Sequence, residues 1–274
     1  MSNLYVQALH IHPVKSVAGT APDEMAVEPW GLSGDRRWAL VDTEGTVITQ
    51  RQQPRLALAA ARPLGGGAVA LSAPGMAGLT VEVPEPGPLE PVTLFGKKIE
   101  TVVAASAAAD WFSAYLGVPA RLVHMDDPAV RRPVDPQYAL PGETVSLADG
   151  YPVLLTTLAS LDALNSLIAQ GDHPEEGPLP MNRFRPNVVV AGAEAWAEDG
   201  WRRIAIGDAV FRGARECGRC IVTTTDQATA ERGKEPLKTL ARHRRIGKSL
   251  AFGRQLVPVR TGTVRVGDEV RVLE

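Results

Sequence analysis

The sequence predicts an α+β protein that is mostly β: a β-rich N-terminal part, then an antiparallel β-barrel or sandwich with a few helices. Near the C-terminus, two pairs of apolar runs are each separated by Gly-Asp, at Gly207-Asp208 and Gly267-Asp268. Gly and Asp tolerate the positive φ of tight hairpin turns. Residues 63–91 are crowded with Gly and Pro, which make irregular connections between short strands. Few segments show helical spacing.

The N-terminal part begins with a predicted strand at Tyr5–Ile11. Residues 37–41 and 46–49 flank Thr43-Glu44-Gly45 and predict a hairpin. A helix is expected from Ser106, which can cap its start, to Leu116, and Gly117 can end it.

The C-terminal part follows a segment rich in Pro and Asp at residues 126–150, where we place a domain boundary, giving domains 1–125 and 126–274. Thr157 caps a second predicted helix with leucines at helical spacing, which Gly171 ends. Proline suits the first turn of a helix, so a third helix is expected from Pro236 to about Arg244. The predicted strands are 188–190, 202–206, 209–213, 263–266 and 269–273.

The composition is that of a soluble globular protein, with 45% hydrophobic and 22% charged residues among 274. No apolar run is long enough to span a bilayer and no signal peptide is visible, so we expect a cytoplasmic protein without a membrane partner. Residues 201–260 hold 14 Lys and Arg but 5 Asp and Glu. This basic segment indicates either a bound anion or a solvated charged face. Aromatic residues make up only 5% and do not interleave with basic ones, so we expect no nucleic acid.

The two cysteines, Cys217 and Cys220, are too few for a disulfide framework. Gly218 allows close backbone approach, and Arg219 beside Cys220 favours the thiolate that binds soft metals. A zinc site would need a second cysteine pair or suitably spaced histidines, and a dithiol redox site would need a βαβ unit; neither is present. Spacing alone favours two inert cysteines at a bend, with a metal ligand as the second interpretation.

Two further clusters are typical of anion binding. Asn182, Arg183, Arg185 and Asn187 precede a predicted strand, and arginine binds phosphate through a bidentate fork. Lys15-Ser16 follows the first strand without the glycines of a P-loop, and Arg36 lies downstream beside an aspartate. Surface salt bridges are the alternative for any one of these. No nucleophilic triad stands out.

Taken together, these segments resemble the MOSC family, in the branch with a MOSC N-terminal β-barrel domain, which includes the mitochondrial amidoxime-reducing components and their bacterial relatives. The resemblance covers nearly the whole chain. The segments that carry it are His12-Pro13-Val14-Lys15-Ser16, Gly34-Asp35-Arg36-Arg37-Trp38, Arg183-Phe184-Arg185-Pro186-Asn187, Arg219-Cys220, Thr223-Thr224-Thr225-Asp226 and Lys234-Glu235-Pro236-Leu237.

The resemblance implies a MOSC N-terminal β-barrel-like domain at 1–125, a MOSC domain at 126–274, and a molybdenum cofactor of the molybdopterin type. It makes Cys220 the catalytic cysteine and the ligand to molybdenum. At the level of the family, the resemblance also implies pyridoxal phosphate binding. The residues that the resemblance assigns to binding the cofactor are Lys15, Ser16, Arg36, Thr157, Ser160, Arg185, Asn187 and Arg219.

The function implied is an oxidoreductase that reduces N-hydroxylated compounds: hydroxylamines, amidoximes or N-hydroxylated bases. No cysteines remain for an iron–sulfur cluster, so electrons are expected from a separate ferredoxin- or cytochrome-type protein. The alternative is a cofactor carrier or sulfur-transfer protein without turnover, because a MOSC domain also ends the molybdenum cofactor sulfurases, whose pyridoxal phosphate domain is not present here. We expect a monomer. Gln227 stands where the family usually has proline, a difference expected to alter only a turn.

Overall fold

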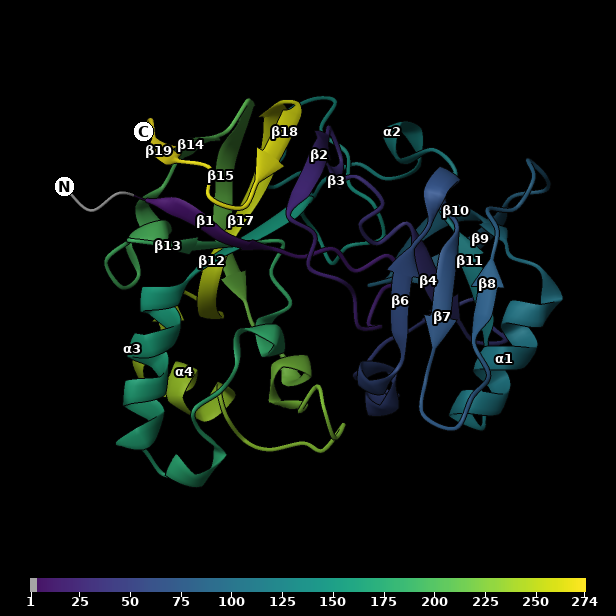
Figure 1. Ribbon diagram of the computed structural model, residues 1–274, viewed down its shortest axis with the longest axis horizontal. Coiled ribbons are helices and arrows are strands. Elements are labelled where there is room, and N and C mark those ends of the chain that lie inside the picture. The colour runs from purple at the N-terminus through teal and green to yellow at the C-terminus, as the bar shows by residue number, and fades with distance from the viewer. Residues whose placement is uncertain (1–3) are drawn as a thin grey trace.

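The computed structural model describes residues 4–274 and confirms the predicted fold class. It is mostly β, with four α-helices among the described residues. Two lobes lie side by side: a nearly closed barrel with helices α3 (Leu158–Ala169) and α4 (Leu237–His243) beneath it, and a second lobe with α1 (Ser106–Leu116) on its outer side (Figure 1). The short α2 (Pro128–Arg131) lies in the connection between the lobes.

The barrel of the C-terminal lobe includes the first strand of the chain. β1 pairs antiparallel with β13, and Val6 bonds to the 267–268 turn on its other side, so the sheet almost closes. The predicted boundary at 125/126 leaves β1 in the first domain, whereas its hydrogen bonds place it in the second lobe. The strand order is β1 (Tyr5–Leu9), β13 (Val188–Ala191), β12 (Val153–Thr157), β17 (Ser249–Arg260), β15 (Ala209–Gly218), β14 (Arg203–Ile206) and β19 (Val270–Val272), with β16 (Arg245–Ile246) pairing with β17.

The N-terminal lobe is a half-barrel covered by a helix and a small sheet. Trp38 and Phe112 are almost fully buried in its main core, where α1 packs. A bridge between Thr46 and Thr93 curls the five-stranded sheet towards closure. That sheet runs β5 (Val47–Ile48), β4 (Trp38–Val41), β11 (Arg121–His124), β10 (Lys97–Val103) and β9 (Glu90–Leu94); the small sheet runs β6 (Ala60–Pro63), β7 (Val69–Ser72) and β8 (Leu79–Val81).

The two Gly-Asp turns have different outcomes. Gly207-Asp208 joins β14 to β15 in the predicted hairpin. At Gly267-Asp268 the turn forms, but the predicted hairpin is wrong, because the flanking strands do not pair with each other. β18 (Gly262–Arg265) pairs with β2 (Glu24–Glu28), which pairs with β3 (Gly31–Leu32), while β19 pairs with β14. Turn residues in the sequence predict a turn, but they do not predict which strands the two flanking segments pair with.

Thr157 and Gly117 cap their helices as predicted, Ser106 does not, and Gly171 directly follows Gln170, the C-cap of α3. Thr157 Oγ1 accepts a hydrogen bond from the Ser160 backbone N–H at the start of α3. Gly117 ends α1 in the left-handed conformation. Ser106 is the first residue of α1 instead of its cap, which is Ala105. No described helix has the length and apolar character needed to cross a membrane.

Gly253 in β17 allows the barrel wall to pass close to β12. Its φ is +81°, and an added Cβ would lie 2.6 Å from the Leu155 carbonyl oxygen. Gly247 also has a positive φ, +55°, but open space around it. We expect Gly253→Ala to lower the free energy of unfolding by about 1–3 kcal/mol more than Gly247→Ala, because both substitutions strain φ and only the first adds a steric clash. Denaturant titration of the two variants measures this; equal losses would mean that β12 and β17 do not approach this closely.

Candidate functional site

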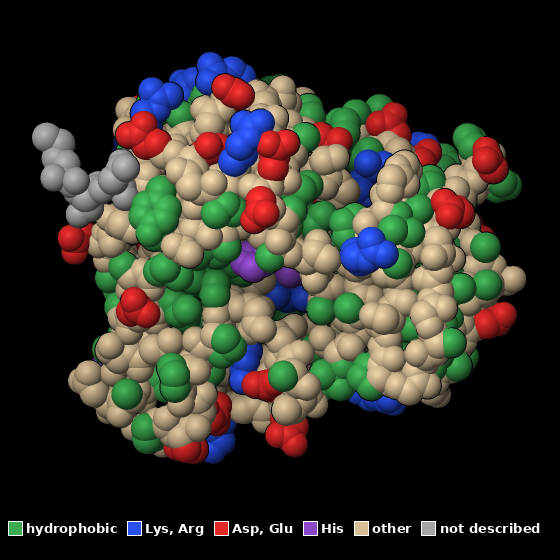
Figure 2. Space-filling view, in the orientation of Figure 1, with side chains coloured by type: hydrophobic (Ala, Val, Ile, Leu, Met, Phe, Trp, Pro, Cys, Tyr) green, Lys and Arg blue, Asp and Glu red, His purple; other side chains and the backbone are tan. Residues whose placement is uncertain are grey.

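A cavity lies between the two lobes, where loops from both meet. Basic side chains and histidines are visible near this junction in the space-filling view (Figure 2). Seven of the nine predicted site residues line the cavity: Lys15, Ser16, Arg36, Arg185, Asn187, Arg219 and Cys220. Sequence reasoning did not single out as site residues several others that line it: Thr49, Arg51, Asp149, Tyr151, Leu154, Phe184 and Gln255 among them.

The charge of the cavity wall is strongly positive. Six lysines and arginines line it together with one carboxylate, that of Asp149; the six are Lys15, Arg36, Arg51, Arg183, Arg185 and Arg219. Two of them have carboxylate partners outside the lining, since Arg36 pairs with Asp35 at 2.5 Å and Arg183 with Asp226 at 2.8 Å, which leaves an excess of cations. We call this space the cationic cavity. Such an excess of buried and half-buried cations favours an anionic ligand.

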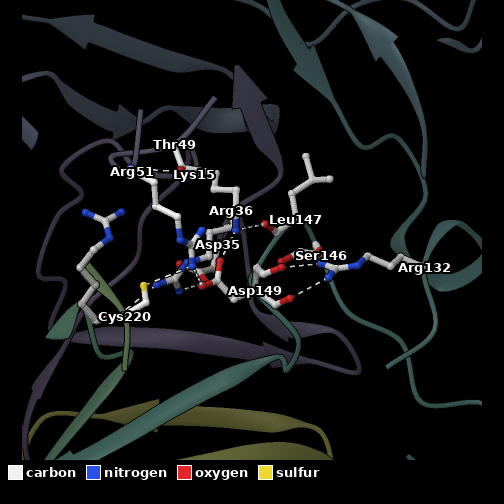
Figure 3. A network of polar contacts seen from close by, with 12 residues as sticks. Lys15, Asp35, Arg36, Thr49, Arg51, Arg132, Ser146, Leu147, Asp149 and Cys220 are labelled. Atoms are coloured by element: carbon white, nitrogen blue, oxygen red, sulfur yellow. Dashed lines mark hydrogen bonds and ion pairs between the residues drawn. The ribbon is translucent and has the colours of Figure 1, made fainter. Parts of the chain in front are cut away.

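Lys15 and Asp149 form an ion pair across the cavity wall (Figure 3). Lys15 is 4% exposed, and its Nζ also donates to the Leu147 carbonyl at 3.0 Å. Burial lowers the pKa of Lys15 to about 8, although Asp149 opposes that shift. Burial alone would raise the pKa of Asp149, but Lys15, Arg51 and Arg36 outweigh it and hold this pKa well below its usual value. Asp149 is therefore ionised, and it faces the cavity with 60% of its side chain accessible.

Arg132 holds the loop that presents Asp149. Its guanidinium donates to the carbonyl oxygens of Ser146 at 2.8 Å, Ala148, and Asp149 at 2.8 Å (Figure 3). Burial lowers the pKa of Arg132 to about 10. A buried guanidinium bound to three carbonyls fixes the backbone of this loop, which otherwise has no regular structure.

Arg36, Arg185 and Asn187 form a connected group on the wall of the cavity. Arg36 donates to Asn187 Oδ1 at 3.2 Å and to the Arg185 carbonyl at 3.1 Å. Arg185 in turn donates to the Val17 carbonyl at 2.8 Å. Its pKa is lowered to about 9, first by burial and then by the charge of Arg36. Both arginines have φ near +50°, a strained conformation that is concentrated at functional sites.

Cys220 lies just after β15 and is partly exposed to the cavity. The arginine nearest its sulfur is Arg51, whose Nη2 lies 3.2 Å from Sγ. The sequence led us to expect Arg219 in this position. Instead, the Arg219 guanidinium donates to the carbonyls of Phe252 and Phe184, and its Nη2 is buried without a partner. An unpartnered buried donor on the wall of the cationic cavity fits a missing acceptor there.

Arg51 is held in place by contacts between the lobes. Gln50 and Gln227 exchange side-chain amide hydrogen bonds at 3.1 and 3.2 Å, and Arg232 donates to the Arg51 carbonyl at 2.9 Å. Gln50 is fully buried and also donates to the Ser16 carbonyl. Gln227 thus does more than alter a turn: it ties the loop that carries Arg51 to the loop that follows Cys220.

Thr157 and Ser160 are not among the residues that line the cavity. Both are fully buried, and both donate to Glu198, at 3.2 and 2.8 Å. Burial raises the pKa of Glu198. Their hydroxyls therefore serve a buried carboxyl group and the start of α3, a role that helix-cap sequence signals cannot separate from ligand binding.

The second cysteine, Cys217, has a different environment from Cys220. It is 7% exposed, its sulfur accepts a hydrogen bond from Gln255 at 3.0 Å, and burial raises its pKa. Cys220 is thus the better metal ligand of the two. As one soft ligand beside six cations, it suits an anionic cofactor that supplies the other ligands to the metal itself.

Comparison with known proteins places both halves of the chain. The MOSC N-terminal beta barrel domain matches residues 3–119, and the MOSC domain matches residues 142–271. Mitochondrial amidoxime-reducing component 1 from Homo sapiens is 34% identical over 98% of this chain and 82% of its own length. Mitochondrial amidoxime reducing component 2 from Rattus norvegicus is 34% identical over 97% of this chain and 82% of its own.

A larger protein shares the same region. Molybdenum cofactor sulfurase from Danio rerio is 31% identical over 85% of this chain but only 30% of its own length. Since family models match most of the chain and relatives above 30% identity match nearly all of it, this protein belongs to the MOSC family, in the branch that joins a MOSC N-terminal beta barrel domain to a MOSC domain.

Proposed function

We propose that the cationic cavity binds a molybdenum–pterin cofactor with Cys220 as the protein's ligand to the metal, and that the protein reduces N-hydroxylated compounds such as hydroxylamines and amidoximes. The observation that carries this proposal is the position of the Cys220 thiol in a cavity lined by six cations. The names of the relatives support the choice of cofactor and reaction.

The chain's own residues would bind and orient the cofactor. Arg36 and Arg185 suit a phosphate group, because guanidinium groups bind phosphate in a bidentate manner, and Lys15 adds a point charge. Ser16 and Asn187 can supply neutral hydrogen bonds. When bound, the cofactor would supply the two electrons for reductive cleavage of the N–O bond, which with two protons gives the N–H product and water.

The protonation states on the wall limit which residues can take part in proton transfer. Asp149 is held ionised, so it has no proton to give, and its lowered pKa makes it a weak proton acceptor. Asp226 is paired with Arg183 at 2.8 Å, and backbone N–H groups of Ala228 and Thr229 help to lower its pKa, so its role is structural. With a metal on Cys220, Arg51 would either keep its hydrogen bond to the sulfur or turn to Asp149 Oδ2, which lies 3.8 Å from its Nη2.

Electrons for the reaction would come from a separate ferredoxin- or cytochrome-type protein, because the two cysteines of this chain cannot hold an iron–sulfur cluster. The second candidate function is that of a cofactor carrier or sulfur-transfer protein, which the sulfurase relative favours. A carrier needs the same cavity but no access for substrate.

The first prediction concerns metal content. Protein from a host that makes the cofactor should hold molybdenum near one equivalent, and Cys220→Ser should lose the metal or hold it inactive, because a hydroxyl is a poor ligand for a soft site. Elemental mass spectrometry measures this. Cys217→Ser is the matched control and should keep its metal, since Cys217 is buried against Gln255. A metal-free wild type from such a host would contradict the cofactor assignment.

Turnover separates the two candidate functions. With a chemical one-electron donor in place of the partner protein, the loaded protein should reduce hydroxylamine or an amidoxime through many cycles. Product is measured by chromatography against the metal-free protein as a blank. A protein that holds a full equivalent of molybdenum and reduces neither substrate would be a carrier.

Lys15 gives the cavity a pH dependence. Its lowered pKa of about 8 means that it is charged below that pH and loses its charge as the pH rises through it. Sulfate stays doubly charged over this range, so the rise in Tm that sulfate gives to metal-free protein should be larger at about pH 7 than at about pH 9.

The control for this prediction is Lys15→Gln, measured against chloride at equal ionic strength. It should show a smaller sulfate effect and a smaller change between the two pH values; the change that remains comes from Arg185, whose lowered pKa of about 9 means that it also loses charge over this range. His12 does not confuse the comparison, because burial and the nearby Arg185 and Arg36 hold its pKa well below the usual value. A wild-type effect that is the same at both pH values would mean that Lys15 does not act on the anion.

A further inference from the structure

Phe95 occupies an unusual position at the tip of the β9–β10 hairpin. Leu94 pairs with Lys97, so Phe95 and Gly96 form a two-residue turn, and both have positive φ, +51° and +76°. Such turns favour Asn and Gly, because a positive φ is strained for a residue with a bulky side chain. Phe95 is nevertheless a large apolar residue and is 53% exposed.

The Phe95 ring lies against two cations of the cavity. Its centroid is 5.0 Å from Arg51 Cζ and 5.5 Å from Lys15 Nζ. Arg51 in turn reaches the Cys220 sulfur with its Nη2, 3.2 Å away. The hairpin of the N-terminal lobe therefore brings an aromatic ring next to the residues that surround the proposed metal ligand, which lies on the barrel.

A purely structural role explains this position poorly. Contacts with Lys15 and Arg51 account for part of its position, but they leave 53% of the residue's surface accessible. A turn chosen for stability would carry Asn at this place. A strained, exposed aromatic residue beside a cavity is instead typical of a side chain retained for ligand contact.

We propose that Phe95 is a specificity-determining residue for the reaction proposed above: its ring stacks against the planar part of an N-hydroxylated substrate whose N–O group reaches the metal beside Cys220. This inference rests on the proposed function. The Phe95 ring would favour planar, aromatic amidoximes or N-hydroxylated bases over hydroxylamine, which has no planar group that could stack on it.

The test compares benzamidoxime with hydroxylamine as substrates of the loaded enzyme. In Phe95→Asn, kcat/KM for benzamidoxime should fall about tenfold, mainly through KM, because a stacked aromatic contact contributes to binding at about this level. The value for hydroxylamine should change less than about twofold. Phe95→Tyr, which keeps the ring, should restore the wild-type ratio. Asn suits the turn, so the Tm of Phe95→Asn should not fall, and unfolding cannot explain the loss.

A binding measurement keeps this test separate from that of the proposed function. Calorimetric titration of benzamidoxime into loaded, oxidised protein should show binding to wild type and at least about fivefold weaker binding to Phe95→Asn. If wild type binds benzamidoxime but reduces nothing, the proposed function fails and the stacking contact stands. An unchanged ratio between the two substrates, a variant that loses molybdenum, or an effect only on the KM for the donor protein would each overturn the role of Phe95.

Discussion

The site depends on an excess of positive charge in the cavity wall: Arg36 and Arg183 are paired with Asp35 and Asp226, and the other four cations face one ionised carboxylate, that of Asp149. Burying Lys15 in this wall lowers the stability of the folded protein. Its pKa is about 8 in the folded protein and higher in the unfolded chain, so between these values the unfolded chain binds more protons. Its contribution to stability is therefore unfavourable below about pH 8 and improves as the pH rises. A bound anion favours the charged form of Lys15 and offsets this unfavourable contribution. Anion binding should therefore stabilise the folded protein.

The two lobes can hold this arrangement because the chain crosses between them near its beginning. β1 completes the barrel, and the residues directly after it, including Lys15, face the cavity from the other lobe. The Gln50–Gln227 pair then joins the lobes again next to Cys220. Six described non-glycine residues have positive φ; Ser16, Arg36 and Arg185 line the cavity, and Phe95 contacts its cations. Backbone strain is thus concentrated where charge is concentrated.

The sequence predicted the fold class, the three longer helices and most of the cations of the cavity wall, because these depend on local signals: hairpin residues, caps, and basic clusters near strand ends. It did not identify Asp149 or Arg51, whose partners lie far away along the chain; Lys15 and Asp149 are separated by 134 positions. Nor could it distinguish Arg219, which neighbours Cys220 in sequence but binds carbonyls of the barrel, from Arg51, which reaches the sulfur from the other lobe. The sequence around Thr157 and Ser160 is the same whether these residues cap a helix or bind a ligand, so it could not distinguish the two roles.

A cationic cavity with one available thiol is required equally by a reductase and by a carrier of the same cofactor, so this wall cannot separate the two. The difference must arise where a substrate would approach Cys220. Near the sulfur the chain places Arg51, which lies between Cys220 and Asp149, and Phe95, whose strained and exposed ring contacts Arg51 and Lys15. A carrier would have no need of an accessible aromatic ring beside the metal ligand, because its cofactor only has to be held and released. The physical argument for a reaction at this site therefore depends more on the rim of the cavity, supplied by the N-terminal lobe, than on the barrel that carries the cysteine.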